Sequence, residues 1–319
     1  MDHHHLLEFL IAVNAKDIRH RRGGPPWPPC ARTAIAVLCA VGVSARAGAD
    51  AMKIVSGFVE SGGEQIYYES IGTGEPVVLS HGLGGNHAIW YQQVPVLAKH
   101  FQVITWDQRG FGRSSDTQKQ SGPAAAAEDL AALLDHLKIS KARLVGQSMG
   151  GWAVVGFALK HPDRVQQLVL ADTIGGIYTP EAAKHFDAYI REAATSPPPD
   201  QMDFARHPAL GDELGAANPA QALLYREIAS IAPPAPAGMG LKLRQTSYPL
   251  EDVRKLNVPV LFVVGEHDPI FPPAVIRSVA AEVKGARVVE LPGAGHSPYF
   301  ETPNAWNEAV SAFLSEPTH

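Results

Sequence analysis

From residue 51 onward, hydrophobic positions fall into short, β-branched runs that alternate with longer segments of helical spacing. Several short runs, such as "VPVLFVVG" at 258–265, are almost continuously apolar, as expected of parallel strands covered on both faces. The pattern predicts eight strands, at 52–60, 65–70, 76–82, 101–107, 142–147, 165–172, 258–265 and 286–291.

Helix-length segments separate these strands, at 87–99, 123–138, 149–161, 273–283 and 303–315. Alternation of strands and helices predicts an α/β fold, with a mostly parallel eight-stranded sheet flanked by helices. The first two strands are close together in the chain, so we expect an antiparallel hairpin at one edge of the sheet. The core of the fold is predicted to comprise residues 50–172 and 251–319.

One long segment, residues 173–250, interrupts this alternation. It carries no convincing strand, and it contains the proline clusters "SPPPD" at 196–200 and "APPAPAG" at 232–238. Stretches such as "PEAAKHFDAYIREAA" have the composition and spacing of helices. We therefore predict a helical insertion between the sixth and seventh strands.

The first 49 residues have a different composition from the rest of the chain. Four arginines precede the apolar run "TAIAVLCAVGV" at 33–43, and "SARAGADA" follows it. A basic segment, a short apolar run and an A-x-A site are typical of a secretory signal, with cleavage after Ala47 or Ala49. We predict a periplasmic or secreted protein; if this leader does not direct export, the protein is cytoplasmic.

The positions of the cysteines and the net charge argue against several kinds of chemistry and partner. Both cysteines, Cys30 and Cys39, lie in the leader, so the body has neither a disulfide nor a thiol nucleophile. The net charge of −5 and the lack of long basic runs argue against a nucleic-acid partner. No apolar stretch reaches 18 residues, so we expect no permanent membrane span. We find no nucleotide-binding or metal-ligand motif, and we expect no cofactor and no metal.

A serine lies between two glycines where the fifth strand meets the next helix, in "LVGQSMGGWAVVGF" at 144–157. The pattern G-x-S-x-G is typical of a nucleophile held on a tight turn, where side chains at Gly146 and Gly150 would collide with the backbone. The turn would also present the Met149 N–H to a developing oxyanion. A second donor is expected from Leu83, in "LSHGLGGN" after the third strand. Ser148 is therefore a candidate nucleophile.

A nucleophilic serine needs a base and an acid that orients the base. His296, in "LPGAGHSPYFETP" after the last strand, is the best-placed histidine, because its loop lies at the carboxyl edge of the sheet. Asp268, in "VVGEHDPIFPP" after the seventh strand, is the predicted acid, and Asp172 at the end of the sixth strand is the competitor. The order serine, aspartate, histidine fits this kind of triad.

These motifs together resemble the α/β-hydrolase superfamily over residues 52–316. The resemblance rests on "HGLGGN", "WDQRGFGRSS", "GQSMGG", "GEHDPIFPP" and "GAGHSPYFETP", in that order. It implies a catalytic triad of Ser148, Asp268 and His296. It also implies oxyanion donors at Leu83 and Met149.

The resemblance also bears on the insertion and on the reaction. Residues 173–250 correspond to the helical cap of the family, and the stretch at 89–115 is most similar to the enol-lactonase and small carboxylesterase branch. Carbon–carbon hydrolases of this fold often carry tryptophan directly after the histidine, where this chain has Ser297. Asp107 and Arg109 match a structural turn, for which we expect no catalytic role.

We therefore expect a serine hydrolase that cleaves a small carboxylic ester or lactone through an acyl-enzyme. The alternatives are a carbon–carbon bond hydrolase, a cofactor-free peroxidase or perhydrolase, and a non-catalytic ligand receptor. Aromatic and apolar residues that we expect near the substrate are Trp90, Trp152, Tyr178, Ile270 and Phe271.

Overall fold

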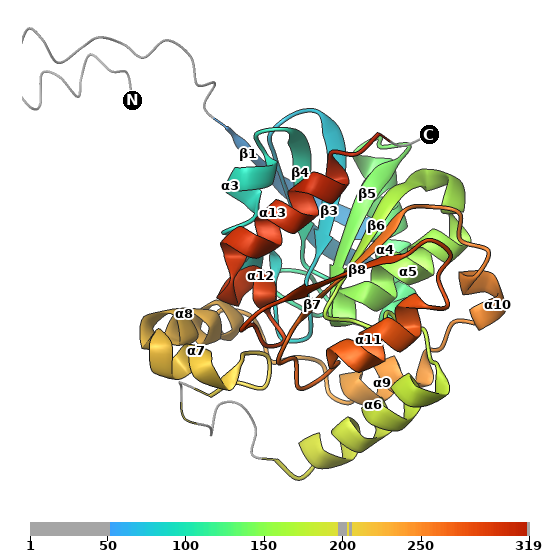
Figure 1. The fold of residues 1–319 in the computed structure, drawn as a ribbon. Helices are drawn as coiled ribbons and strands as arrows, with labels where there is room; N and C mark the ends of the chain where they lie inside the picture. The colour runs from blue at the N-terminus through green and yellow to red at the C-terminus, as the bar shows by residue number, and fades with distance from the viewer. Residues whose placement is uncertain (1–51, 197–202, 204–205, 318–319) are drawn as a thin grey trace, which may run out of the picture. The chain divides into compact units, whose positions relative to one another are not determined.

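The computed structural model describes residues 52–196, 203 and 206–317 (Figure 1). The leader, with its predicted signal and both cysteines, lies outside the described residues. The strands are β1 (Ile54–Ser61), β2 (Glu64–Ile71), β3 (Glu75–Ser80), β4 (Phe101–Trp106), β5 (Ala142–Gln147), β6 (Val165–Ala171), β7 (Val260–Gly265) and β8 (Arg287–Leu291). All eight predicted strands are present, and each end lies within two residues of its prediction.

The eight strands form one sheet in the order β1-β2-β4-β3-β5-β6-β7-β8. From β4 to β8 neighbouring strands are parallel, whereas β1 pairs with β2 and β2 with β4 in antiparallel fashion. β1 and β2 form the predicted edge hairpin, and their turn contains Gly62 and Gly63, both with positive φ. A two-residue turn of this kind requires positive φ at both positions, which glycine adopts without a steric penalty.

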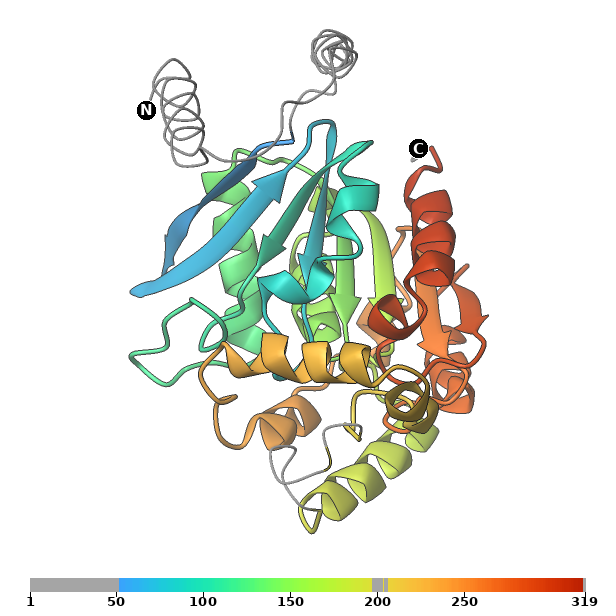
Figure 2. The same ribbon diagram turned by 90° about the vertical axis from the view of Figure 1, so that its left-hand side faces the viewer.

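Helices cover both faces of the sheet (Figures 1 and 2). One apolar core packs between the sheet and the helices α4 (Pro123–His136), α5 (Met149–Lys160) and α11 (Pro273–Ala280). A second core lies on the opposite face, against α3 (Val94–Leu97), α12 (Pro298–Glu301) and α13 (Pro303–Leu314). The strands β5 and β7 are buried along their whole length, which explains the continuous apolar run of β7.

The predicted helix at 87–99 is wrong. The segment forms the 3₁₀ helix η2 (His87–Trp90) and, after a turn, the four-residue helix α3. Asn86 caps η2 by accepting a hydrogen bond from the Ala88 N–H, and Pro95 opens α3. Because proline has no N–H to donate and favours the first turn of a helix, it starts a new helix here instead of continuing the earlier one.

The described residues between β6 and β7 form helices, and the helices other than the last gather beyond one end of the sheet (Figure 2). Its first helix begins at Thr179, whose side chain accepts a hydrogen bond from the Ala182 N–H. The helices are α6 (Pro180–Ala193), α7 (Asp212–Ala217), α8 (Pro219–Ser230), α9 (Met239–Gln245) and α10 (Leu250–Val253). Across the described ranges, no helix combines the length and the apolar character needed to cross a bilayer.

Candidate active site

Ser148 lies on a sharp turn between β5 and α5, with φ 48° and ψ −119°. The flanking glycines make this turn sterically feasible. A Cβ at Gly146 would lie 2.6 Å from the Gly150 carbonyl oxygen, and a Cβ at Gly150 would lie 2.2 Å from the Ser80 carbonyl oxygen. Both distances are far below van der Waals contact, so the turn requires glycine on either side of the serine, and Ser148 is left partly exposed.

His296, on the loop after β8, reaches Ser148, and Asp268, on the loop after β7, reaches His296. His296 Nε2 lies 2.9 Å from Ser148 Oγ, and His296 Nδ1 lies 2.9 Å from each carboxylate oxygen of Asp268. Because Nδ1 faces a carboxylate, it carries the ring proton, and Nε2 presents its lone pair to the serine hydroxyl. The three side chains selected from the sequence are thus joined in one hydrogen-bonded chain.

Backbone N–H groups hold the Asp268 carboxyl group in place. Asp268 Oδ1 accepts hydrogen bonds from the N–H groups of Ile270 and Phe271, at 2.8 and 3.0 Å. Both Asp268 and His296 are 2% exposed, so water competes little with these contacts. These hydrogen bonds fix the Asp268 carboxyl group, which can therefore hold the orientation of the His296 ring.

The two predicted oxyanion donors lie at the start of α5 and on the loop after β3. The Met149 N–H is at the first position of α5, where backbone donors have no partner within the helix. Leu83 follows Gly82, whose backbone passes so close to Ser148 that a Cβ there would lie 3.1 Å from Ser148 Cβ. Within the described residues, neither N–H donates to a protein acceptor. Both donors therefore remain available to a bound group.

Aromatic side chains pack next to the histidine. The Phe271 ring lies 5.9 Å from the His296 ring and 6.2 Å from the Trp152 ring, between centroids. Phe186 of α6 packs against both Phe271 and Trp152, at 5.2 and 6.1 Å. Phe186 was not predicted, because it lies in the helical insertion and no motif marks its position. These rings bring the insertion into contact with the site.

The other predicted substrate residues lie around this aromatic cluster, except Trp90. Ile270 supplies one N–H to Asp268, and the Tyr178 hydroxyl donates to the Leu243 carbonyl at 3.0 Å. Trp90 instead is fully buried in the core below α12 and α13, where its ring packs against Tyr299 and Trp306. We therefore no longer expect Trp90 to contact substrate.

Polar residues that the sequence analysis did not select lie on another side of His296. The Ser297 hydroxyl is 3.2 Å from the Tyr225 hydroxyl of α8. His207 packs edge-on against the Tyr225 ring, at 5.0 Å between centroids. Burial, then the charges of Arg226 and His296, lower the pKa of His207 to about 4. His207 is therefore a neutral imidazole near the site at neutral pH.

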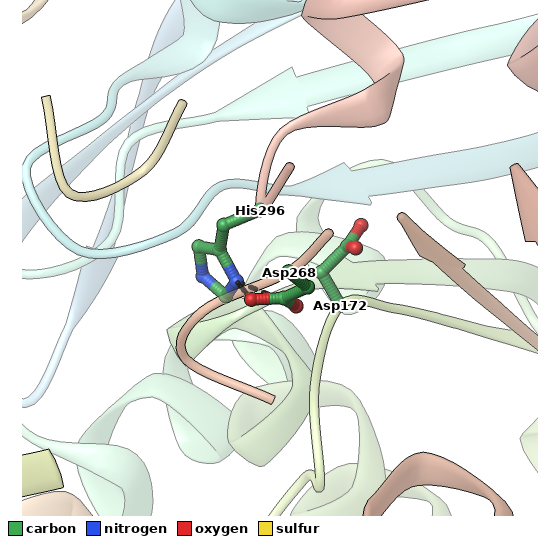
Figure 3. Close-up of side chains that lie close together, drawn as sticks. All are labelled: Asp172, Asp268 and His296. Atoms are coloured by element: carbon green, nitrogen blue, oxygen red, sulfur yellow. Dashed lines mark hydrogen bonds and ion pairs between the residues drawn. The ribbon is translucent and has the colours of Figure 1, made fainter. Parts of the chain in front are cut away.

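Asp172, the alternative acid, lies close to Asp268 (Figure 3). Asp172, Asp268 and His296 each offer an atom of metal-binding type, all within 4.8 Å of one another. His296 Nδ1 uses its proton to donate to Asp268, however, and a metal ion would have to replace that proton. A triad and a metal centre would thus be mutually exclusive uses of these atoms.

Comparisons with known proteins place this geometry in a family. A family model described as alpha/beta hydrolase fold matches residues 75–303. A Caulobacter sp. (strain K31) protein, provisionally named carbamate hydrolase RutD, is 31% identical over 250 residues, covering 76% of this chain and 91% of its own.

Two solved structures have the same fold. A thermophilic esterase of Thermogutta terrifontis superposes with a TM-score of 0.68 at 28% identity, covering 82% of this chain and 98% of its own. The enol-lactonase of Burkholderia xenovorans LB400 superposes with a TM-score of 0.66 at 26% identity, covering 82% of this chain and all of its own. The chain belongs to the alpha/beta hydrolase fold family.

Proposed function

We propose that this protein is a serine hydrolase that cleaves carboxylic esters or lactones through an acyl-enzyme. The observation that carries the proposal is the chain of hydrogen bonds from Ser148 through His296 to Asp268, 2.9 Å at each step. A serine hydroxyl is a weak nucleophile until a base takes its proton. His296 Nε2 is within reach of that proton, and its other nitrogen is held by the acid.

The proposed reaction follows from the direction of these hydrogen bonds. As Ser148 Oγ attacks the substrate carbonyl, its proton moves to His296 Nε2, and Asp268 stabilises the imidazolium that forms. The tetrahedral intermediate collapses when His296 gives this proton to the departing oxygen, which leaves Ser148 acylated. A water molecule then attacks the acyl group while His296 accepts its proton, and His296 returns this proton to Ser148 Oγ as the acid product departs.

The free backbone donors support stabilisation of the intermediate. The N–H groups of Leu83 and Met149 would receive the negative charge that develops on the carbonyl oxygen. The Met149 donor lies at the N-terminus of α5, where the helix dipole also favours negative charge. Loss of one such donor in other hydrolases lowers kcat by about 10² to 10³, so this pair would be a major contributor to rate.

The surroundings of the triad support a small, largely apolar acyl group. Phe271, Trp152 and Phe186 form an aromatic cluster beside His296, and we propose that the helices between β6 and β7 act as the family's cap. An alkoxide or enolate leaves with one proton from His296, whereas an amide nitrogen needs closer placement of that proton. Similarity to an esterase and an enol-lactonase favours oxygen leaving groups, while similarity to RutD makes carbamates the comparison to include.

The test is a set of substrates that share one short acyl group and differ in the bond to be cleaved. Aryl ester, lactone, amide, carbamate and vinylogous diketone are compared by kcat/KM with the purified protein. We expect aryl esters and small lactones to be hydrolysed fastest, with weak or no action on amides. Faster cleavage of the amide, the carbamate or the carbon–carbon bond would contradict the proposal. Parallel assays of Ser148→Ala exclude a contaminating esterase.

A further inference from the structure

Asp172 is a buried carboxyl group that the proposed reaction does not use. It follows β6 directly, is 0% exposed, and has φ 48°, in the left-handed region that non-glycine residues seldom adopt. Its Oδ1 accepts a hydrogen bond from the Gly265 N–H at 2.9 Å. Within the described residues, no donor reaches its other oxygen, Oδ2. A buried acceptor without a donor is destabilising and requires an explanation.

The neighbouring carboxyl group supplies that explanation. Oxygens of Asp172 and Asp268 lie within 4.8 Å of each other in a site closed to water. Asp268 accepts from two backbone N–H groups and from His296, whereas Asp172 accepts from one N–H. Two carboxyl groups that share a buried site disfavour each other's charge, and with fewer donors around it Asp172 is the better place for a proton than Asp268.

We propose that Asp172 is a positioning residue, a neutral carboxylic acid that donates a hydrogen bond from Oδ2 to Asp268 and so fixes the carboxylate that orients His296. The inference rests on the proposed triad for its catalytic consequence, but the protonation of Asp172 itself does not depend on turnover. Figure 3 shows Asp172 in the same cluster as Asp268 and His296, with the drawn hydrogen bonds joining only Asp268 and His296. The protonated carboxyl would satisfy Oδ2 as a donor.

The groups that surround Asp172 also favour its protonated form. Burial and the charge of Asp268 raise the pKa of Asp172 well above its usual range, although its bond from Gly265 opposes this, and the carboxylate of Glu301 in α12 raises it further. Tyr225 of α8 and Tyr299 of α12 also face it, and burial raises the pKa of both hydroxyls, so they are neutral at neutral pH.

Two substitutions at Asp172 distinguish the effect of its proposed hydrogen bond to Asp268 from the effect of its charge. Asp172→Asn keeps an acceptor for Gly265, places an NH₂ donor toward Asp268, and tolerates positive φ. Asp172→Ala removes the donor. We expect Asp172→Asn to retain kcat within a few-fold, with the acid limb of the kcat/KM profile unmoved. We expect Asp172→Ala to lower kcat by about 10- to 100-fold, because a hydrogen bond to a charged group is lost.

The direction of the pH shift tests the protonation state. Without a donor, Asp268 stabilises the imidazolium more strongly, so the acid limb of Asp172→Ala should move to higher pH. If Asp172 were charged instead, both substitutions would remove a negative charge, and the limb would move to lower pH in both. That result, or equal kcat in the two variants, would overturn the proposal.

A second measurement needs no turnover and no activity in the alanine variant. Infrared difference spectra at neutral pH, wild type minus Asp172→Asn, should contain the C=O stretch of a protonated carboxylic acid. Asp163→Asn, at an exposed position, is the matched control and should not remove that band. If Asp172→Asn leaves the band unchanged, Asp172 is not protonated and the inference fails. This outcome is independent of whether the protein hydrolyses esters.

Discussion

Ser148 Oγ and His296 Nε2 lie 2.9 Å apart, although 148 positions separate the two residues in the chain. Ser148 follows the central strand β5, and His296 follows β8 at the edge of the sheet, with β6 and β7 between them. The loop after β8 must therefore extend back across the carboxyl ends of two strands. A hydrogen bond from the Gln147 side chain to the His296 carbonyl, at 3.1 Å, helps to hold this loop over the serine.

Replacing Ser148 by alanine tests the nucleophile. Ser148→Ala removes a hydroxyl and little volume, so we expect the folded structure and its thermal unfolding to be unchanged. The kcat for an aryl ester should fall by about 10⁴ to 10⁶, as in triads whose members act as a unit. Ester hydrolysis close to the wild-type rate would show that another residue is the nucleophile.

Asp268→Asn tests the acid through the tautomer of His296. An amide can donate to Nδ1, which places the ring proton on Nε2, where it blocks transfer of the Ser148 proton. We expect kcat to fall by about 10⁴, as for the equivalent change in serine proteases. The matched comparison is Asp172→Asn, for which we expect a far smaller loss. The reverse order would mean that the acid follows β6 instead of β7.

The positions of strands such as β7 were predictable from the sequence. A strand that is buried on both faces needs apolar residues at nearly every position, and such a run is easy to recognise. The break in the predicted helix at 87–99 was not predictable in this way, because the helical spacing continues across it. Propensity over a window cannot detect such a local break. Pro95, in the first turn of α3, is the residue that signals the start of a second helix.

The candidate site also has a part that the sequence predicts and a part that it does not. Ser148, Asp268 and His296 follow strands whose ends meet at one edge of the sheet, so their proximity follows from strand order. The positions of Phe186 and His207 depend instead on how the helices between β6 and β7 pack on the core, for which the sequence has no motif. Trp90 was expected near the substrate because it is a large aromatic residue close to a motif, but it lies in the core.

Export of the protein remains a proposal and is tested on the full-length chain. We expect a signal peptidase to cleave after Ala47 or Ala49, because small residues there follow the apolar run 33–43. Intact-mass spectrometry of protein made in an export-competent host should find a mature N-terminus at Gly48 or Asp50. Recovery of the chain with Met1 intact would contradict export and favour the cytoplasm.

Gly150→Ala tests the steric basis of the turn. The new Cβ would lie 2.2 Å from the Ser80 carbonyl oxygen and 2.7 Å from the carbonyl carbon, and neither backbone atom can move without disturbing β3. We expect the free energy of unfolding to fall by about 1–3 kcal/mol, with loss of ester hydrolysis as the Met149 donor shifts. Gly240→Ala in α9, where a Cβ meets no atom within 4 Å, is the matched control. Urea unfolding should find that control unchanged or up to about 1 kcal/mol more stable.

The low pKa of His207 predicts that acid lowers the stability of the folded protein. Its pKa of about 4 in the folded chain lies below the value of 6.5 for a free histidine. As the pH falls from 6.5 to 4, the unfolded chain therefore binds a proton that the folded chain does not, and stability decreases through this window. His207→Asn keeps an acceptor for the Ala209 N–H, which His207 Nδ1 now accepts at 3.1 Å, but does not titrate. The stability of the wild type relative to this variant, from urea unfolding, should thus be greatest above pH 6.5 and decline toward pH 4. A difference that stays constant from pH 7.5 to pH 4 would mean that folding does not perturb the protonation of His207.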